Sequence, residues 1–96
     1  MLVIITYDIQ TKTEEGRRRL SQVSRVCKNY GQRVQNSVFE CDVTTVQLVE
    51  LKKKLLQIIN PNEDSLRIYN MGLSYKNKIE HFGVKESYDP EGILLL

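Results

Sequence analysis

A run of β-branched and aromatic residues near the start of the chain constrains the fold more than any other feature. Residues 2–9 read Leu-Val-Ile-Ile-Thr-Tyr-Asp-Ile, which is the composition of a strand buried inside a sheet. The chain has 96 residues, so residues 1–96 form a single domain with a thin core. We therefore expect this run to be the most buried strand of one small sheet.

A helix and an extended segment follow this strand. Thr11 and Glu14 match a capping box, and the helix that it opens ends at Gly31. The apolar stripe of this helix has helical spacing and consists of Leu20, Val23, Cys27 and Tyr30. Residues 33–43 then read as extended chain, in which residues 36–37 form either a kink or a tight turn between two strands.

A second helix and a last strand complete the pattern. Thr44 and Gln47 match another capping box, and residues 60–62 (Asn-Pro-Asn) end the helix that it opens. The apolar residues of this helix are Val46, Val49, Leu51, Leu55, Leu56, Ile58 and Ile59. Residues 65–71 alternate as a strand does. The order strand, helix, strand or hairpin, helix, strand predicts an α+β fold. Its type is the ferredoxin-like βαββαβ sandwich, with two helices on one face of an antiparallel sheet.

The tail, residues 72–96, is less regular and ends in Ile93, Leu94, Leu95 and Leu96. Four apolar residues at a terminus are unfavourable in water. Either they pack on their own domain or they add as a strand to the sheet of another chain, and the second arrangement predicts a homodimer.

The charge of the chain is concentrated in one segment. The formal net charge of +2 is too small to indicate a partner. Between residues 11 and 33, however, two acidic residues stand against seven basic ones: Lys12, Arg17, Arg18, Arg19, Arg25, Lys28 and Arg33. A solvated helix face is the plain interpretation of such a run. The number of arginines, whose planar forks match phosphate oxygens, favours phosphate binding.

Asp8 is the residue best placed for chemistry. The sequence has no phosphate-binding glycine loop, no HExxH or CxxC motif, and a single histidine, His81, in a charged stretch that reads as a loop. A carboxylate at the end of a buried strand needs a partner or a function, although tightening the following turn is the plain alternative. One aspartate anchors Mg²⁺ poorly, so a metal site here needs two Asp8 side chains across a twofold axis.

The two cysteines, Cys27 and Cys41, lack the spacing of metal ligands. We interpret them as reduced, partly buried small hydrophobes of a cytoplasmic protein, with a disulfide between them as the weaker alternative. No apolar run is long enough to cross a bilayer, and residues 1–8 do not read as a signal peptide.

Three segments resemble a known family. They are VIITYDI (residues 3–9), GRRRL (residues 16–20) and GQRVQNSVFE (residues 31–40). Their order, their spacing and the length of the chain are similar to those of the small CRISPR-associated proteins that partner the CRISPR integrase in spacer acquisition. The resemblance implies a ferredoxin-like homodimer in which the C-terminal strand, here the segment around residues 93–96, crosses to the sheet of the partner.

The resemblance also implies roles for particular residues. Asp8 takes the position of the family's catalytic, metal-binding aspartate, with Mg²⁺ as the cofactor. The implied contacts to a nucleic-acid backbone fall on Arg17, Arg18, Arg19 and Arg33, which would bind DNA or RNA with little sequence preference. Tyr7, Ser37 and Phe39 match positions near the aspartate, although turn and core roles explain them nearly as well. Many relatives carry a second Asp or Asn shortly after the aspartate, where this chain has Gln10, Thr11 and Lys12.

Two functions follow from the resemblance. The chain is either a Mg²⁺-dependent endonuclease acting on RNA or double-stranded DNA, or a dimeric scaffold that holds DNA between integrase subunits. We favour the scaffold in the cell, with nuclease activity as an additional property. The alternative from a different class is a non-catalytic ferredoxin-like RNA-binding module. It is less favoured because no pair of exposed aromatic residues for base stacking is apparent.

Overall fold

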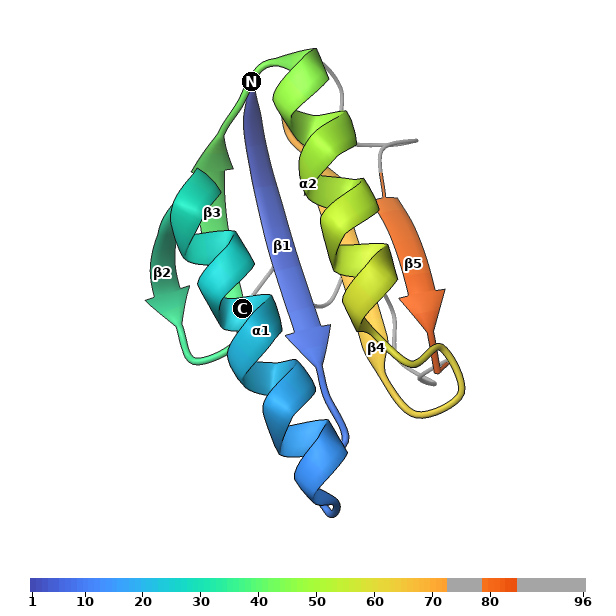
Figure 1. Ribbon diagram of the computed structural model, residues 1–96. Coiled ribbons are helices and arrows are strands. Elements are labelled where there is room, and N and C mark those ends of the chain that lie inside the picture. The colour runs from blue at the N-terminus through green and yellow to red at the C-terminus, as the bar shows by residue number, and fades with distance from the viewer. Residues whose placement is uncertain (73–78, 85–96) are drawn as a thin grey trace.

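The computed structural model describes residues 1–72 and 79–84, which form one antiparallel sheet covered by two helices on the same face (Figure 1). The strands lie side by side in the order β2-β3-β1-β4-β5. Their bounds are Leu2–Asp8 for β1, Gln32–Gln35 for β2, Val38–Asp42 for β3, Ser65–Asn70 for β4 and Ile79–Gly83 for β5. The helices are α1, Glu14–Tyr30, and α2, Thr45–Ile58. The predicted ferredoxin-like α+β fold is thus confirmed.

Strand β1 lies at the centre of the sheet, as its composition predicts. It pairs antiparallel with β3 on one side and with β4 on the other. Val3, Ile5 and Tyr7 point toward the helices and are buried, whereas Ile4 and Thr6 lie on the opposite face and are half-buried. The core between sheet and helices is completed by Val23 and Cys27 of α1, Phe39 and Cys41 of β3, Leu51 and Leu55 of α2, and Leu66 and Ile68 of β4.

Local sequence signals are confirmed in most places. The side chain of Thr44 accepts a hydrogen bond from the backbone of Gln47, whose own side chain caps Thr44 in return, which is the predicted capping box. Residues 36–37 form the tight turn of the β2–β3 hairpin. Not every apolar residue of α2 is buried, because Val46, Val49 and Leu56 are exposed.

The predicted start of the first helix was wrong by two residues. Thr13, and not Thr11, caps α1, and its hydroxyl oxygen accepts the backbone N–H of Gly16 at 3.0 Å. Glu14 is therefore the first helical residue and cannot act as the last member of a capping box.

The sequence did not predict β5. This strand pairs with β4, and it places His81 directly opposite Arg67 rather than in a loop. The Nε of Arg67 donates to Nδ1 of His81 at 3.0 Å, and Nε2 of His81 lies 2.7 Å from the carbonyl oxygen of Val84. The predicted exchange of residues 93–96 falls outside the described residues.

The two cysteines are free thiols and are fully buried, more deeply than expected. Burial, followed by the neighbouring Cys41 thiol, raises the pKa of Cys27 to about 12. Burial also raises the pKa of Cys41. Both therefore act as small hydrophobic side chains of the core. In residues 1–72 and 79–84, neither helix is long and apolar enough to cross a membrane.

Gly16 provides a test of how the β1–α1 loop packs. A Cβ atom at this position would overlap the backbone carbonyl of Gln10. Alanine normally stabilises a helix relative to glycine, but here Gly16→Ala is expected to lower the free energy of unfolding by about 1–3 kcal/mol through overpacking. Urea denaturation measures the change, with the exposed Ser21→Ala as the control. A Gly16→Ala protein more stable than the wild type would contradict the close approach.

Candidate metal site and nucleic-acid interface

Asp8 is the last residue of β1 and is exposed. Because Tyr7 points into the core, the alternation of the strand places Asp8 on the face of the sheet that the helices do not cover. Asp8 lies opposite Ser65 in the register with β4. Within the described part of the chain, its carboxylate forms no hydrogen bond or ion pair, so its oxygens are available to a ligand.

The turn between β2 and β3 lies beside the end of β1. The backbone N–H of Tyr7 donates to the carbonyl oxygen of Ser37 at 3.1 Å. Ser37 is therefore a turn residue next to Asp8, whereas Tyr7 and Phe39 point into the core on the other face of the sheet. The backbone of Ser37 is thus held beside the residue before Asp8, whereas the side chains of Tyr7 and Phe39 lie on the face of the sheet opposite to Asp8.

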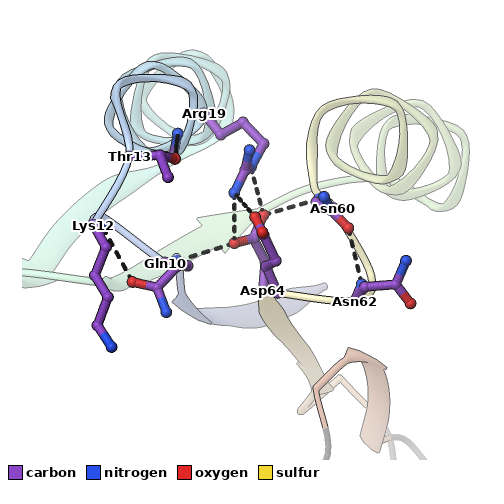
Figure 2. A network of polar contacts seen from close by, with 9 residues as sticks. Gln10, Lys12, Thr13, Arg19, Asn60, Asn62 and Asp64 are labelled. Carbon is purple, nitrogen blue, oxygen red and sulfur yellow. Dashed lines mark hydrogen bonds and ion pairs between the residues drawn. The ribbon is translucent and has the colours of Figure 1, made fainter.

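A second aspartate, Asp64, organises this end of the molecule, and the sequence did not single it out. Its carboxylate is fully buried and accepts the backbone N–H groups of Gln10, at 3.0 Å, and Asn60, at 2.8 Å. Arg19 binds both carboxylate oxygens, with Nε at 2.8 Å and Nη2 at 3.3 Å, as Figure 2 shows. One side chain thus ties α1 to the loops that follow β1 and α2.

The ionised state of Asp64 is favoured by its partners. Burial by itself would raise the pKa of this carboxyl group, but the hydrogen bonds from Arg19 and from the backbone of Asn60 and Gln10 outweigh it. The pKa is therefore lowered from its usual range. A carboxylate with these partners is a structural group, and its lone pairs are not free for a metal.

Arg19 is correspondingly held inside the fold, unlike the exposed arginines beside it. It also donates to Glu63 at 2.9 Å, and only 14% of its side chain is exposed. The pKa of Arg19 is raised, chiefly by its hydrogen bonds to Asp64, so the guanidinium stays charged. The structure thus gives Arg19 a role in the fold that the charge pattern alone did not indicate.

The neighbouring arginines differ from Arg19 in exposure. Arg17 and Arg18 lie on the solvent side of α1, where Nη1 of Arg17 donates to the carbonyl oxygen of Thr11 at 3.1 Å. Arg18 lies 3.7 Å from Glu14 in an exposed ion pair, which contributes little to stability. Both guanidinium groups can therefore exchange these contacts for a phosphate.

Arg33 is also exposed, but it is held in place. Its Nη2 donates to Oγ of Ser24 at 3.1 Å, and its Cζ lies 5.3 Å from the centre of the Phe39 ring. This cation lies on the edge strand β2, on the helix side of the sheet.

The residues of one chain fit Mg²⁺ only in part. In residues 1–72 and 79–84, no group of three or more His, Cys, Asp or Glu side chains is close enough to hold a metal ion. Mg²⁺ keeps several waters and is often bound by one or two carboxylates. The available Asp8 oxygens suit such an ion if a second copy supplies another carboxylate.

Comparison with known proteins shows to which family the chain belongs. The model of the family described as "CRISPR associated protein Cas2" matches residues 1–79. The chain belongs to the Cas2 family. It is 55% identical over 95 residues to the CRISPR-associated endonuclease Cas2 of Halalkalibacterium halodurans, covering 99% of both chains. It is 52% identical over 96 residues to the CRISPR-associated endoribonuclease Cas2 of Chlorobaculum tepidum, covering all of both chains.

A solved Cas2 structure has the same fold. The crystal structure of Streptococcus pyogenes Cas2 at pH 6.5 superposes with a TM-score of 0.70 at 49% identity, covering 83% of this chain and 96% of that one. The predicted family is thus confirmed, and the two relatives compared above are named as a CRISPR-associated endonuclease and a CRISPR-associated endoribonuclease.

Asp64 makes the stability of the chain depend on pH. Because the pKa of its carboxyl group is lower in the folded state, the stabilisation is complete at neutral pH and is lost as the pH falls below about 4. Asp64→Asn is expected to lower the free energy of unfolding by about 3–5 kcal/mol at pH 7. The difference from the wild type should shrink on acidification. Urea denaturation at a series of pH values and one protein concentration measures both effects.

Glu63→Gln is the matched control, because Glu63 contacts the same arginine from a more exposed position. It is expected to change the free energy of unfolding by less than about 1 kcal/mol. Equal losses in the two variants would contradict the structural role of Asp64.

Proposed function

We propose that two copies of this Cas2-family chain form a dimer that holds nucleic acid by its backbone and binds Mg²⁺ through the paired Asp8 carboxylates. The observation that carries the proposal is the contrast between the two aspartates at one end of the sheet. Asp64 is buried and fully engaged, whereas Asp8 is exposed and has no partner among the described residues. A free carboxylate at the end of the central strand is available to a ligand.

Dimer formation is supported by half-buried side chains on the face of the sheet opposite the helices. Both helices lie on one face, so the half-buried Ile4, Thr6 and Val38 on the other face can pack against a second copy (Figure 1). Asp8 lies at the end of this same face, so packing of two copies there would bring the two carboxylates toward the twofold axis. An isologous contact of this kind supplies the second metal ligand that one chain lacks.

The proposed reaction is hydrolysis of a phosphodiester bond. Mg²⁺ would supply positive charge to the phosphate and activate water for the attack. The chain's own contribution is the anchoring of the ion by Asp8 and the binding of the backbone by Arg17, Arg18 and Arg33. Because these arginines would contact phosphates rather than bases, the proposal extends to RNA and to double-stranded DNA.

The role that we propose in the cell is that of a scaffold in spacer acquisition, in which the dimer holds DNA between subunits of the CRISPR integrase. The support is that Arg17 and Arg18 on α1 and Arg33 on β2 are exposed, and that the contacts described above for these arginines do not involve Asp8. Backbone binding through these arginines does not require hydrolysis.

Substitution of Asp8 distinguishes phosphodiester hydrolysis from the scaffold role. Asp8→Asn is expected to reduce Mg²⁺-dependent cleavage of RNA and duplex DNA to the background of a protein-free sample, because the ion loses its charged ligand. Dimerisation, measured by sedimentation equilibrium, and spacer integration should both be retained.

The control is Asp42→Asn, which removes an exposed aspartate from the end of β3, at the opposite end of the sheet. It should cleave like the wild type. Cleavage that persists in Asp8→Asn would show that Asp8 does not bind the catalytic ion, and loss of integration in this variant would refute the scaffold role.

The two exposed arginines at the start of α1 are tested by the salt dependence of binding. Arg17→Ala and Arg18→Ala should each weaken binding to duplex DNA and reduce the slope of log K against log salt by about 0.9, the value for one phosphate contact. Fluorescence anisotropy measures the slope. Lys53→Ala, which removes an exposed cation from α2, should leave the slope unchanged, and equal effects of all three variants would indicate nonspecific charge attraction.

A further inference from the structure

Arg33 is an exposed cation whose guanidinium is held at two points. One is the hydrogen bond from Nη2 to Oγ of Ser24, at 3.1 Å, and the other is the face of the Phe39 ring, 5.3 Å from Cζ. An exposed arginine without such contacts samples many rotamers. The two contacts therefore restrict Arg33 to a small part of its conformational range before any ligand is present.

Ser24 is in turn fixed by a residue of the central strand. Its Oγ lies 2.7 Å from the phenol oxygen of Tyr7. Burial is the main reason that the pKa of Tyr7 is raised, so the phenol keeps its proton at neutral pH. The Tyr7 ring stacks on Phe39, with centroids 6.3 Å apart and an interplanar angle of 22°. Tyr7, Ser24, Phe39 and Arg33 thus form a closed cluster, with one residue each from β1, α1, β3 and β2.

We propose that Ser24, oriented by Tyr7, is a positioning residue that presents the Arg33 guanidinium to a backbone phosphate. The inference rests on the proposed function, because it assumes that the chain binds nucleic acid. Ser24 accepts a hydrogen bond from only one nitrogen, so most of the five N–H donors of the guanidinium stay available. A guanidinium fixed by a ring face and one hydrogen bond can still bind phosphate through two parallel donors.

The gain from this arrangement is preorganisation. Immobilising a long side chain on binding lowers the affinity, and this cost is reduced when the side chain is already ordered in the free protein. Ser24 itself is half-buried. The core contacts of this part of α1 come from its neighbours Val23 and Cys27, which are fully buried.

The experiment is a double-mutant cycle on DNA affinity. The dissociation constant of a fluorescently labelled duplex DNA of mixed sequence is measured at fixed salt for the wild type, Ser24→Ala, Arg33→Ala and the double variant. Ser24→Ala is expected to weaken binding about threefold, and to have no further effect once Arg33 is alanine. A hydroxyl that only stabilised the fold would not show this dependence on Arg33.

Two further variants complete the test. Ser21→Ala makes the same substitution at an exposed position on the same helix, so it should bind DNA like the wild type. Tyr7→Phe keeps the stacked ring and removes the hydroxyl that orients Ser24. It should weaken binding less than Ser24→Ala does, and again only when Arg33 is present. Thermal unfolding confirms that each variant is folded at the temperature of the assay.

The outcomes distinguish this inference from the proposed function. Wild-type affinity in Ser24→Ala, alongside weaker binding in Arg33→Ala, would overturn the role of Ser24 and leave nucleic-acid binding intact. Fully additive effects of the two substitutions would overturn it as well. An Arg33→Ala protein that binds like the wild type would remove Arg33 from the interface. A wild-type chain that does not bind duplex DNA or RNA would refute the proposed function and this inference together.

Discussion

The pairing of Arg19 with Asp64 is the interaction on which the candidate site depends. A fully buried carboxylate is unfavourable unless charge and hydrogen bonds compensate for the lost water, and Asp64 has both. The same carboxylate accepts the N–H of Gln10, two residues beyond Asp8, while its backbone carbonyl accepts the N–H of Val84 after β5. The end of the central strand is thereby fixed to its surroundings, and Asp8 stands on a rigid support although its own side chain is exposed.

The sequence predicted those parts of the fold that local patterns encode. The central strand, the capping box of α2 and the β2–β3 turn each depend on residues a few positions apart, and all three were found. The Asp64 network depends on partners up to 54 residues away, at Gln10, which no local period can reveal. Strand β5 was missed for a related reason. Only Ile79 and Phe82 of its five residues are large and apolar, and they do not alternate with polar residues, so the strand is defined by pairing with β4 and not by an apolar pattern.

The arginine run shows how one charge pattern can contain two roles. Successive residues of a helix point in directions about 100° apart, so Arg17, Arg18 and Arg19 cannot all share one environment. Arg19 stands four residues before Val23 of the buried stripe and is turned inward, where it meets Asp64. The position of the apolar stripe could therefore have separated Arg19 from its exposed neighbours. That its partner would be Asp64, however, required the tertiary structure.

Side chains alternate along β1, so the adjacent residues Tyr7 and Asp8 lie on opposite faces of the sheet. Tyr7 points toward α1 and joins the cluster around Arg33, whereas Asp8 lies on the face that the helices leave uncovered. In the proposed function, one copy of the chain supplies Arg17, Arg18 and Arg33, whereas the paired carboxylates require a second copy on the face opposite the helices. Under the proposed function, dimer formation therefore controls hydrolysis much more strongly than it controls binding of a single backbone segment. The proposed function therefore allows one copy of the chain to hold nucleic acid without cleaving it.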